Sequence, residues 1–488
     1  MSSSLAAESA QNATALLMAG RAVDALQLLE RVLTDQPDDA VLRRLAGEAA
    51  LRAGQLQVAT AHLEVAVTLE PDHVDGVVNL AAGLLGLGAA ARVVALLEPW
   101  ATRHPSRPLL LNLGRALQDH HRLEAAEEVV RRILATDPTD VEALNNLGTI
   151  LRDAGRCGEA IACFERALTL APQLQAARDN LAHSWLAEGD FRRGFAYFEG
   201  RRFVDATGLS ARLERWDGRP RPGLTLHVVA EQGFGDMLMF CRFEATLAER
   251  GIDAILHVHS RLVRLLKRSG GFREVVAYGR APIGATARWV PLMSLPHLLD
   301  LTLATLPPLV PYLQADRQRV HRYAGWLGPK VGPRVGIAWS GNPQSEQDDL
   351  RGRSVPLTAF APLLDVPGLQ LISLQRQHGL EQARHVGFAA QLRHPEPELD
   401  AGPDGFLDTA ALLAALDLVV TCDTSIAHLA GGLGRPVWVA LHHTPDWRWL
   451  RKQSVSPWYP TMRLVRQTVP GDWSGVFAAI AGQVANAA

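Results

Sequence analysis

The sequence has few of the features that mark secreted, membrane or metal-binding proteins. Its 488 residues contain four cysteines, none of them in a CxxC pair, and neither HExxH nor DxD occurs. We therefore expect no metal and no other cofactor. Isolated cysteines of this kind are typically reduced and buried, which favours a cytoplasmic location.

Long apolar stretches and a strong net charge are also missing. No run of about 20 uncharged apolar residues occurs, so we expect no membrane span, and the N-terminus lacks the pattern of a signal peptide. The net charge of −2 supplies no strong field for nucleic acid, so we expect no nucleic-acid partner. A chain of this length exceeds one hydrophobic core and predicts about three domains.

What the sequence does contain, over its first 200 residues, is a repeat. Prolines and glycines recur at intervals of 33 or 34 residues, with His121 in the one missing glycine position. In the clearest unit, apolar and small residues fall on two helix faces. The repeat resembles the tetratricopeptide repeat, which predicts an α-solenoid over residues 1–203. The repeated positions are Pro37, Pro71, Pro105, Pro138, Pro172, Gly20, Gly54, Gly88, Gly155 and Gly189.

A solenoid groove favours binding of a protein partner over a role as a rigid spacer or dimerisation arm. Asn79, Asn112 and Asn145 recur at a spacing of 33, and Asn146 adjoins them. These side chains suit either a bound peptide backbone or bridges between adjacent helices. The last unit carries an aromatic cluster over residues 191–198, which we interpret as a docking surface for the next domain.

The composition changes after the solenoid, at residues 204–222, where closely spaced glycines and prolines predict a linker. Strand and helix patterns then alternate, which predicts parallel sheets covered on both faces. We expect two doubly wound units, 223–318 and 319–470, and a C-terminal helix over 471–488. One helix is predicted over residues 237–250.

Three residues in the loop after the first predicted strand, EQGFGD, stand out. Gly233 and Gly235 permit a tight turn and the close approach of a ligand. Asp236 falls in the first turn of the next helix. It suits a general base, or a carboxylate that is stabilised by the helix N-terminus.

Polar residues also follow the strands of the second predicted unit. A helix that begins near Ser425 after a polar turn offers backbone N–H groups to a phosphate. Arg351 or Arg353 could neutralise a diphosphate, although a solvated loop explains them equally well. The candidate donor-binding residues are Ser340, Asn342, Gln375, Asp423, Thr424, Ser425 and His428.

The segments EQGFGD, VGIAWSGNP, FLDTAALLAALDLVV and CDTSIAHLAGGLGRPVWVAL together resemble bacterial tetratricopeptide-repeat glycosyltransferases. Their catalytic half is similar to the heptosyltransferases of glycosyltransferase family 9. The resemblance implies a GT-B fold, in which two Rossmann-like units face each other across a cleft, the first unit taking the acceptor and the second the nucleotide sugar. It also implies inverting transfer without a metal, with Asp236 as the base.

The chain departs from the heptosyltransferases in two ways. The lysine that commonly follows the WSGNP-like segment is missing, and heptosyltransferases lack a solenoid. The solenoid favours a protein acceptor modified on Ser or Thr, for which flagellin is an example. The alternatives are an enzyme of cell-surface polysaccharide or lipopolysaccharide synthesis that is tethered by its solenoid, and a protein-binding scaffold without activity.

Overall fold

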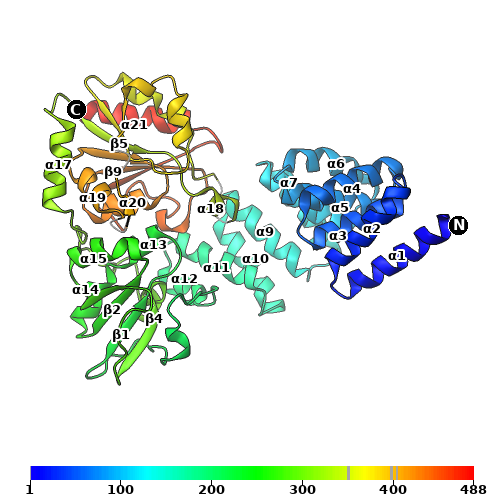
Figure 1. The fold of residues 1–488 in the computed structure, drawn as a ribbon, viewed down its shortest axis with the longest axis horizontal. Helices are drawn as coiled ribbons and strands as arrows, with labels where there is room; N and C mark the ends of the chain where they lie inside the picture. The colour runs from blue at the N-terminus through cyan, green and yellow to red at the C-terminus, as the bar shows by residue number, and fades with distance from the viewer. Residues whose placement is uncertain (1, 349–351, 396–398, 403–404, 488) are drawn as a thin grey trace. The chain divides into compact units, whose positions relative to one another are not determined.

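The protein has two compact units, which are described separately below. The computed structural model describes residues 2–348, 352–395, 399–402 and 405–487. The first unit is Met1–Asn180 and the second is Leu181–Ala488 (Figure 1). Among the described residues, no helix combines the length and the apolar character needed to cross a membrane.

The first unit consists of helices that run up and down in sequence order, as the repeat predicts (Figure 1). From α1 to α10, each helix packs against the next one along the chain. The helices are α1 (Ser2–Met18), α2 (Ala22–Asp35), α3 (Ala40–Arg52), α4 (Leu56–Leu69), α5 (Val74–Gly86), α6 (Ala90–Arg103), α7 (Arg107–Asp119), α8 (Leu123–Thr136), α9 (Val141–Asp153), α10 (Cys157–Leu170) and α11 (Gln175–Ala187), the last of which contains the boundary between the units.

The repeated glycines lie in the turns within the helical hairpins and have left-handed backbone conformations. Gly54 has a φ of 73° and Gly155 a φ of 80°. His121, which replaces glycine in this register, has a φ of 58° and therefore adopts the same turn. The geometry of the turn is thus kept where the residue that favours it is absent.

Small residues let paired helices approach closely. A Cβ atom at Gly148 of α9 would lie 2.4 Å from the ring of Phe164 in α10. Phe164 and Ala160 are both fully buried. The small residue Gly148 therefore lets α9 and α10 pack closely together.

The boundary between the compact units falls at residue 180 rather than at the predicted 203. Helix α12 (Phe191–Phe198) buries Phe191, Phe195 and Phe198 in the core of the second unit. Phe195 lies edge-on to Trp447, with ring centroids 5.6 Å apart. The aromatic residues are thus a packing surface, as the sequence predicted.

The second unit contains two parallel sheets. The first has the order β3-β2-β1-β4 and the second the order β10-β9-β8-β5-β6-β7. The first sheet consists of β1 (Thr225–Val229), β2 (Asp253–Val258), β3 (Glu274–Ala277) and β4 (Ala287–Pro291). The second consists of β5 (Arg334–Ala338), β6 (Gln370–Ser373), β7 (Leu392–Arg393), β8 (Leu418–Thr421), β9 (Val437–Leu441) and β10 (Met462–Arg466).

Helices cover both faces of the second sheet (Figure 1). On one face, Val335 and Ile337 share a core with Phe477 of the C-terminal helix α21. On the other, Val419 and Val439 share a core with α19 and α20. The helices of this unit are α13 (Phe234–Phe240), α14 (Phe243–Glu249), α15 (Val263–Ser269), α16 (Leu295–Leu298), α17 (Arg317–Leu327), α18 (Pro343–Asp348), α19 (Leu407–Ala414), α20 (Ser425–Gly432) and α21 (Ser474–Ala487), and the 3₁₀ segments include η1 (Leu209–Ala211), η4 (Leu357–Asp365) and η8 (Trp447–Trp449).

One local prediction is refined and one is wrong. The predicted linker 204–222 packs on the second unit: Leu209 lies with Val229 and Trp289 on the first sheet, and Trp216 is buried. The single helix predicted over 237–250 is two helices, α13 and α14.

The helix break lies at Cys241 and Arg242. There the Arg242 Nε donates back to the Met239 carbonyl, at 3.1 Å. The first helix also begins earlier than predicted, at Phe234, after Gly233 as its N-cap.

Candidate functional site

Two loops that follow strands of different sheets meet in the second unit. One leads from β1 into α13 and the other from β8 into α20, and these two helices pack together. A Cβ atom at Gly235 would lie 2.9 Å from His428 Cδ2 and 3.8 Å from Ser425 Cα. Glycine is therefore the residue that fits this approach. Gly233, in contrast, is the N-cap of α13 and has no such close neighbour in the other loop.

Asp236 has a defined orientation beside this contact. Its Oδ2 accepts from the Gly233 N–H at 3.1 Å, and its Oδ1 is ion-paired with Arg448. The side chain is 14% exposed. The structural interpretation of Asp236 as an N-terminal helix carboxylate is confirmed, and its neighbour Gly235 lies against the turn after β8.

Arg448 is the main site residue that the sequence analysis missed. It lies in η8, and its side chain is 11% exposed. Its Nη1 donates to Asp446 Oδ1 at 2.7 Å, while its Nη2 donates to Asp236. Although burial acts to lower it, the pKa of Arg448 is held above its ordinary value by Asp236 and Asp446. The signal available in the sequence was an arginine between two tryptophans, Trp447 and Trp449. Both tryptophans are buried in the structure.

Asp423 is a buried carboxylate in the turn after β8. Burial and the neighbouring Asp446 raise its pKa above the ordinary value, against the opposing influence of Arg448 and Arg353. The turn therefore holds a carboxyl group that is neutralised more easily than an exposed aspartate.

His428 is held as a neutral side chain. Its Nδ1 lies 3.0 Å from the Tyr459 hydroxyl, and its ring stacks on Trp449 at a centroid distance of 5.2 Å. Burial, together with Arg448, lowers the pKa of His428 to about 3. It therefore suits a fixed hydrogen-bonding role and not proton transfer near neutral pH.

Gln375 holds a loop together. Its Oε1 accepts from the backbone N–H groups of Trp339 and Ser340, and its Nε2 donates to the carbonyls of Ser340 and His378. The buried amide thus has all of its usual hydrogen bonds. In the fold it shapes the Ser340 loop, and contact of Gln375 with a nucleotide-sugar donor stays a prediction.

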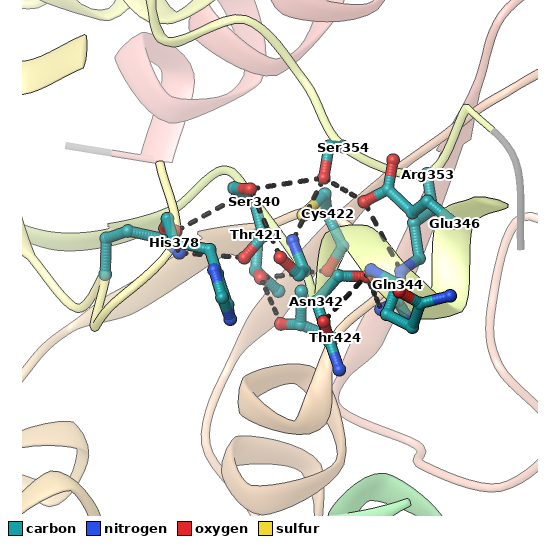
Figure 2. A network of polar contacts seen from close by, with 12 residues as sticks. Ser340, Asn342, Gln344, Glu346, Arg353, Ser354, His378, Thr421, Cys422 and Thr424 are labelled. Atoms are coloured by element: carbon teal, nitrogen blue, oxygen red, sulfur yellow. Dashed lines mark hydrogen bonds and ion pairs between the residues drawn. The ribbon is translucent and has the colours of Figure 1, made fainter. Parts of the chain in front are cut away.

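The end of β5 and the turn after β8 lie side by side, because these strands are neighbours (Figure 2). The Ser340 and Ser354 hydroxyl oxygens lie 3.4 Å apart. Asn342 Oδ1 accepts from the Gln344 N–H at 3.1 Å, so this side chain caps the start of α18.

Of the two predicted cations near this loop, Arg353 faces it. Its Nη2 donates to the Asn342 carbonyl at 3.3 Å, and its Nε lies 3.6 Å from Glu346. A Cβ atom at Gly341 would lie 2.6 Å from the Arg353 guanidinium. Arg351 lies outside the described residues.

The start of α20 has the features of an anion site. Thr424 is its N-cap and makes no side-chain capping bond; its hydroxyl instead lies 3.2 Å from that of Thr421. Thr424 and Ser425 are half-buried. The first N–H groups of the helix are thus without a side-chain cap, which suits a phosphate group. Within the described part of the chain, no group of three His, Cys, Asp or Glu side chains is arranged to hold a metal ion.

In the solenoid, recurring asparagines bridge helices of adjacent repeats. Asn112 Nδ2 donates to the Val78 carbonyl at 3.2 Å, and Asn180 Nδ2 donates to Asn145 Oδ1 at 3.0 Å. Of the two interpretations of these side chains, helix bridging is therefore confirmed for Asn112 and Asn145.

Comparison with known proteins supports the repeats directly. Family models described as tetratricopeptide repeat match residues 16–72 and 111–174. The first unit is a tetratricopeptide-repeat solenoid.

Two solved structures resemble the solenoid region. MamA from Desulfovibrio magneticus RS-1 is 20% identical and covers 35% of this chain and 97% of its own, with a TM-score of 0.33. A thermophilic tetratricopeptide-repeat protein of Thermus thermophilus, TTC0263, is 23% identical and covers 37% of this chain and 98% of its own, with a TM-score of 0.32.

A relative from Caulobacter vibrioides, Protein FlbA, matches beyond the solenoid. It is 28% identical over 437 residues, which cover 76% of this chain and 71% of FlbA. Because this share of the chain exceeds the length of the first unit, the match extends into the second unit.

Proposed function

We propose that this protein is a glycosyltransferase of GT-B architecture that transfers a sugar from a nucleotide-sugar donor to an acceptor hydroxyl with inversion and without a metal. The observation that carries the proposal is the contact between the Asp236 loop and the Asp423–His428 turn. This contact places the Asp236 carboxylate near the start of α20, which suits the diphosphate of a donor. The resemblance of both loops to glycosyltransferase family 9 points to the same reaction.

In the proposed reaction, Asp236 accepts the proton of the acceptor hydroxyl as that oxygen attacks the anomeric carbon. The new carbon–oxygen bond forms while the bond from the anomeric carbon to the diphosphate breaks, and the nucleoside diphosphate (or monophosphate, for a CMP-sugar) leaves. The N–H groups at the start of α20 stabilise the departing negative charge. The neutral His428 holds the turn beside Gly235 in place.

The proposed acceptor is a protein, modified on Ser or Thr, with flagellin as the first candidate. Tetratricopeptide repeats are protein-binding architectures, and the FlbA match spans residues of both units, which supports a joint role for solenoid and α/β unit. The solenoid would supply the specificity for the acceptor.

Replacement of the proposed base tests the activity. UDP-, GDP-, ADP- and CMP-sugars are supplied with an acceptor protein, and nucleotide release and acceptor mass are measured. Asp236→Asn should lower the rate by about 10²–10⁴-fold, the range for loss of a general base. Asp300→Asn is the matched control, because Asp300 forms an exposed ion pair with Arg192. EDTA should leave the rate unchanged.

Three results would count against parts of the proposal. Equal rates for wild type and Asp236→Asn would remove Asp236 as the base. No binding or turnover of any donor by the wild type would instead indicate a non-catalytic scaffold. An unchanged flagellin mass in cells whose surface polysaccharide changes would move the acceptor to a glycan.

A further inference from the structure

Two carboxylates contact the Arg448 guanidinium, and one of them comes from a segment far away in the sequence. Asp236 lies in the first turn of α13, whereas Asp446 lies just before η8, and both are ion-paired with Arg448. Asp423, in the turn after β8, interacts electrostatically with the same cation. This one side chain therefore connects the first turn of α13 to the loop after β9.

Arg448 is itself tightly held. Its backbone N–H donates to Asp446 Oδ1 at 3.0 Å, and its guanidinium lies 4.4 Å from the centroid of the Trp447 ring. Trp447 packs edge-on against Phe195 and Phe198 of α12. On the other side, Trp449 is fully buried and stacks on His428. The backbone and the side chain of Arg448 thus have a single well-supported position.

We propose that Arg448 is the positioning residue for Asp236, the base of the proposed transfer reaction, and that Asp446 holds Arg448 in place for this task. The inference rests on the proposed function, because Asp236 has a catalytic role only there. Arg448 fixes one carboxylate oxygen and the Gly233 N–H fixes the other, so the plane of the carboxylate is set. Each oxygen keeps a second lone pair for the acceptor proton.

The geometry favours this role over direct neutralisation of the donor diphosphate. Both terminal nitrogens of the guanidinium already form ion pairs, Nη2 with Asp236 and Nη1 with Asp446, and the side chain is 11% exposed. Arg353, in contrast, lies against the Ser340 loop, because a Cβ atom at Gly341 would lie 2.6 Å from its guanidinium (Figure 2). Loss of Arg448 should therefore lower the turnover number and leave donor affinity nearly unchanged.

The experiment uses the full-length chain and the donor sugar that the nucleotide-sugar screen identifies. Arg448→Ala should lower kcat by about 100-fold, as expected when a reacting group is misplaced by about 1 Å. The dissociation constants for UDP, GDP, ADP and CMP, measured by calorimetry, should stay within about twofold, below a tenfold change that corresponds to 1.4 kcal/mol. Millimolar guanidinium should restore part of the kcat of Arg448→Ala.

Arg192→Ala is the matched control, since it removes an exposed arginine–aspartate pair from the same unit. Arg192→Ala should change neither kcat nor the nucleotide dissociation constants, and added guanidinium should not alter its kcat. Arg448→Lys and Asp446→Asn provide the same test if Arg448→Ala does not fold. Each should lower kcat with little change in nucleotide affinity.

Two results would overturn the proposal. One is a nucleotide affinity more than tenfold weaker with kcat retained at saturating donor, which would make Arg448 a donor ligand. The other is an unchanged kcat in both Arg448→Lys and Asp446→Asn. Failure of the proposed function would look different, because the wild type itself would then neither bind nor turn over a donor.

Discussion

The two units of this protein keep their shapes by contacts of very different sequence range. In the solenoid, side-chain bonds between adjacent repeats span about one repeat, as in the Asn112–Val78 bond between residues 34 apart. In the second unit, Asp236 and Arg448 are 212 residues apart and Arg242 and Trp458 are 216 apart. A period in the sequence reveals contacts of the first kind, whereas contacts of the second kind depend on how whole sheets are placed.

A strong local test of the solenoid is the close helix-to-helix contact at Gly148. Gly148→Ala would place a methyl group 2.4 Å from the buried ring of Phe164. Overpacking of this kind lowers the free energy of unfolding by about 1–3 kcal/mol. Urea unfolding followed by circular dichroism measures the loss.

Gly158→Ala is the matched control for that test, because nothing lies within 4 Å of the added Cβ atom in α10. It should be neutral or stabilise the protein by less than about 1 kcal/mol. Equal effects of the two substitutions would contradict the importance of the Gly148–Phe164 contact.

Asp423 tests the long-range packing of the second unit through pH. Its pKa is raised in the fold by burial and by Asp446, so the folded state binds this proton more tightly than the unfolded chain. The resulting stability is present at low pH and is lost as the pH rises through the folded pKa. Asp423→Asn should therefore be more stable than the wild type at pH 8, by about 1.4 kcal/mol for each pH unit that separates the folded from the unfolded pKa of Asp423.

The measurement for Asp423→Asn is the difference in melting temperature from the wild type between pH 4 and pH 8. The difference should shrink towards zero in acid. A difference that is independent of pH would mean that the amide acts through packing and not through charge.

The smallest expected effect concerns the one repeat turn without glycine. His121 has a left-handed backbone, which costs an ordinary residue about 1–2 kcal/mol, while glycine costs about 0.5–1 kcal/mol in lost backbone freedom. His121→Gly should therefore stabilise the protein by about 0.5 kcal/mol in urea unfolding.

The reverse substitution at the equivalent position, Gly88→Ala, should destabilise the protein by a similar amount. Gly88 has a φ of 73°, and nothing lies within 4 Å of a Cβ atom added there. A destabilising His121→Gly substitution would show that this side chain contributes more than its backbone costs.

The repeats, the alternation of strands and helices in the second unit, and the start of α20 at Ser425 could all be predicted from the sequence. Each depends on local periodicity, turn chemistry or a strand followed by a polar turn. The four hydrogen bonds of the Gln375 side-chain amide could not be predicted. The four backbone groups that it binds lie on two loops that only the second sheet brings together. Arg448 was missed for the same reason: its neighbours in space are not its neighbours in the sequence.

The three residues of η8 point to three different places. Trp447 packs against α12, Arg448 reaches the first turn of α13, and Trp449 lies on His428. Loops between parallel strands usually tolerate insertions and deletions. The loop after β9 should be an exception, because adding or removing one residue before Trp447 would turn all three side chains away from their partners at once. Chains of this architecture that keep the site should therefore keep the length of this loop even where its other residues vary.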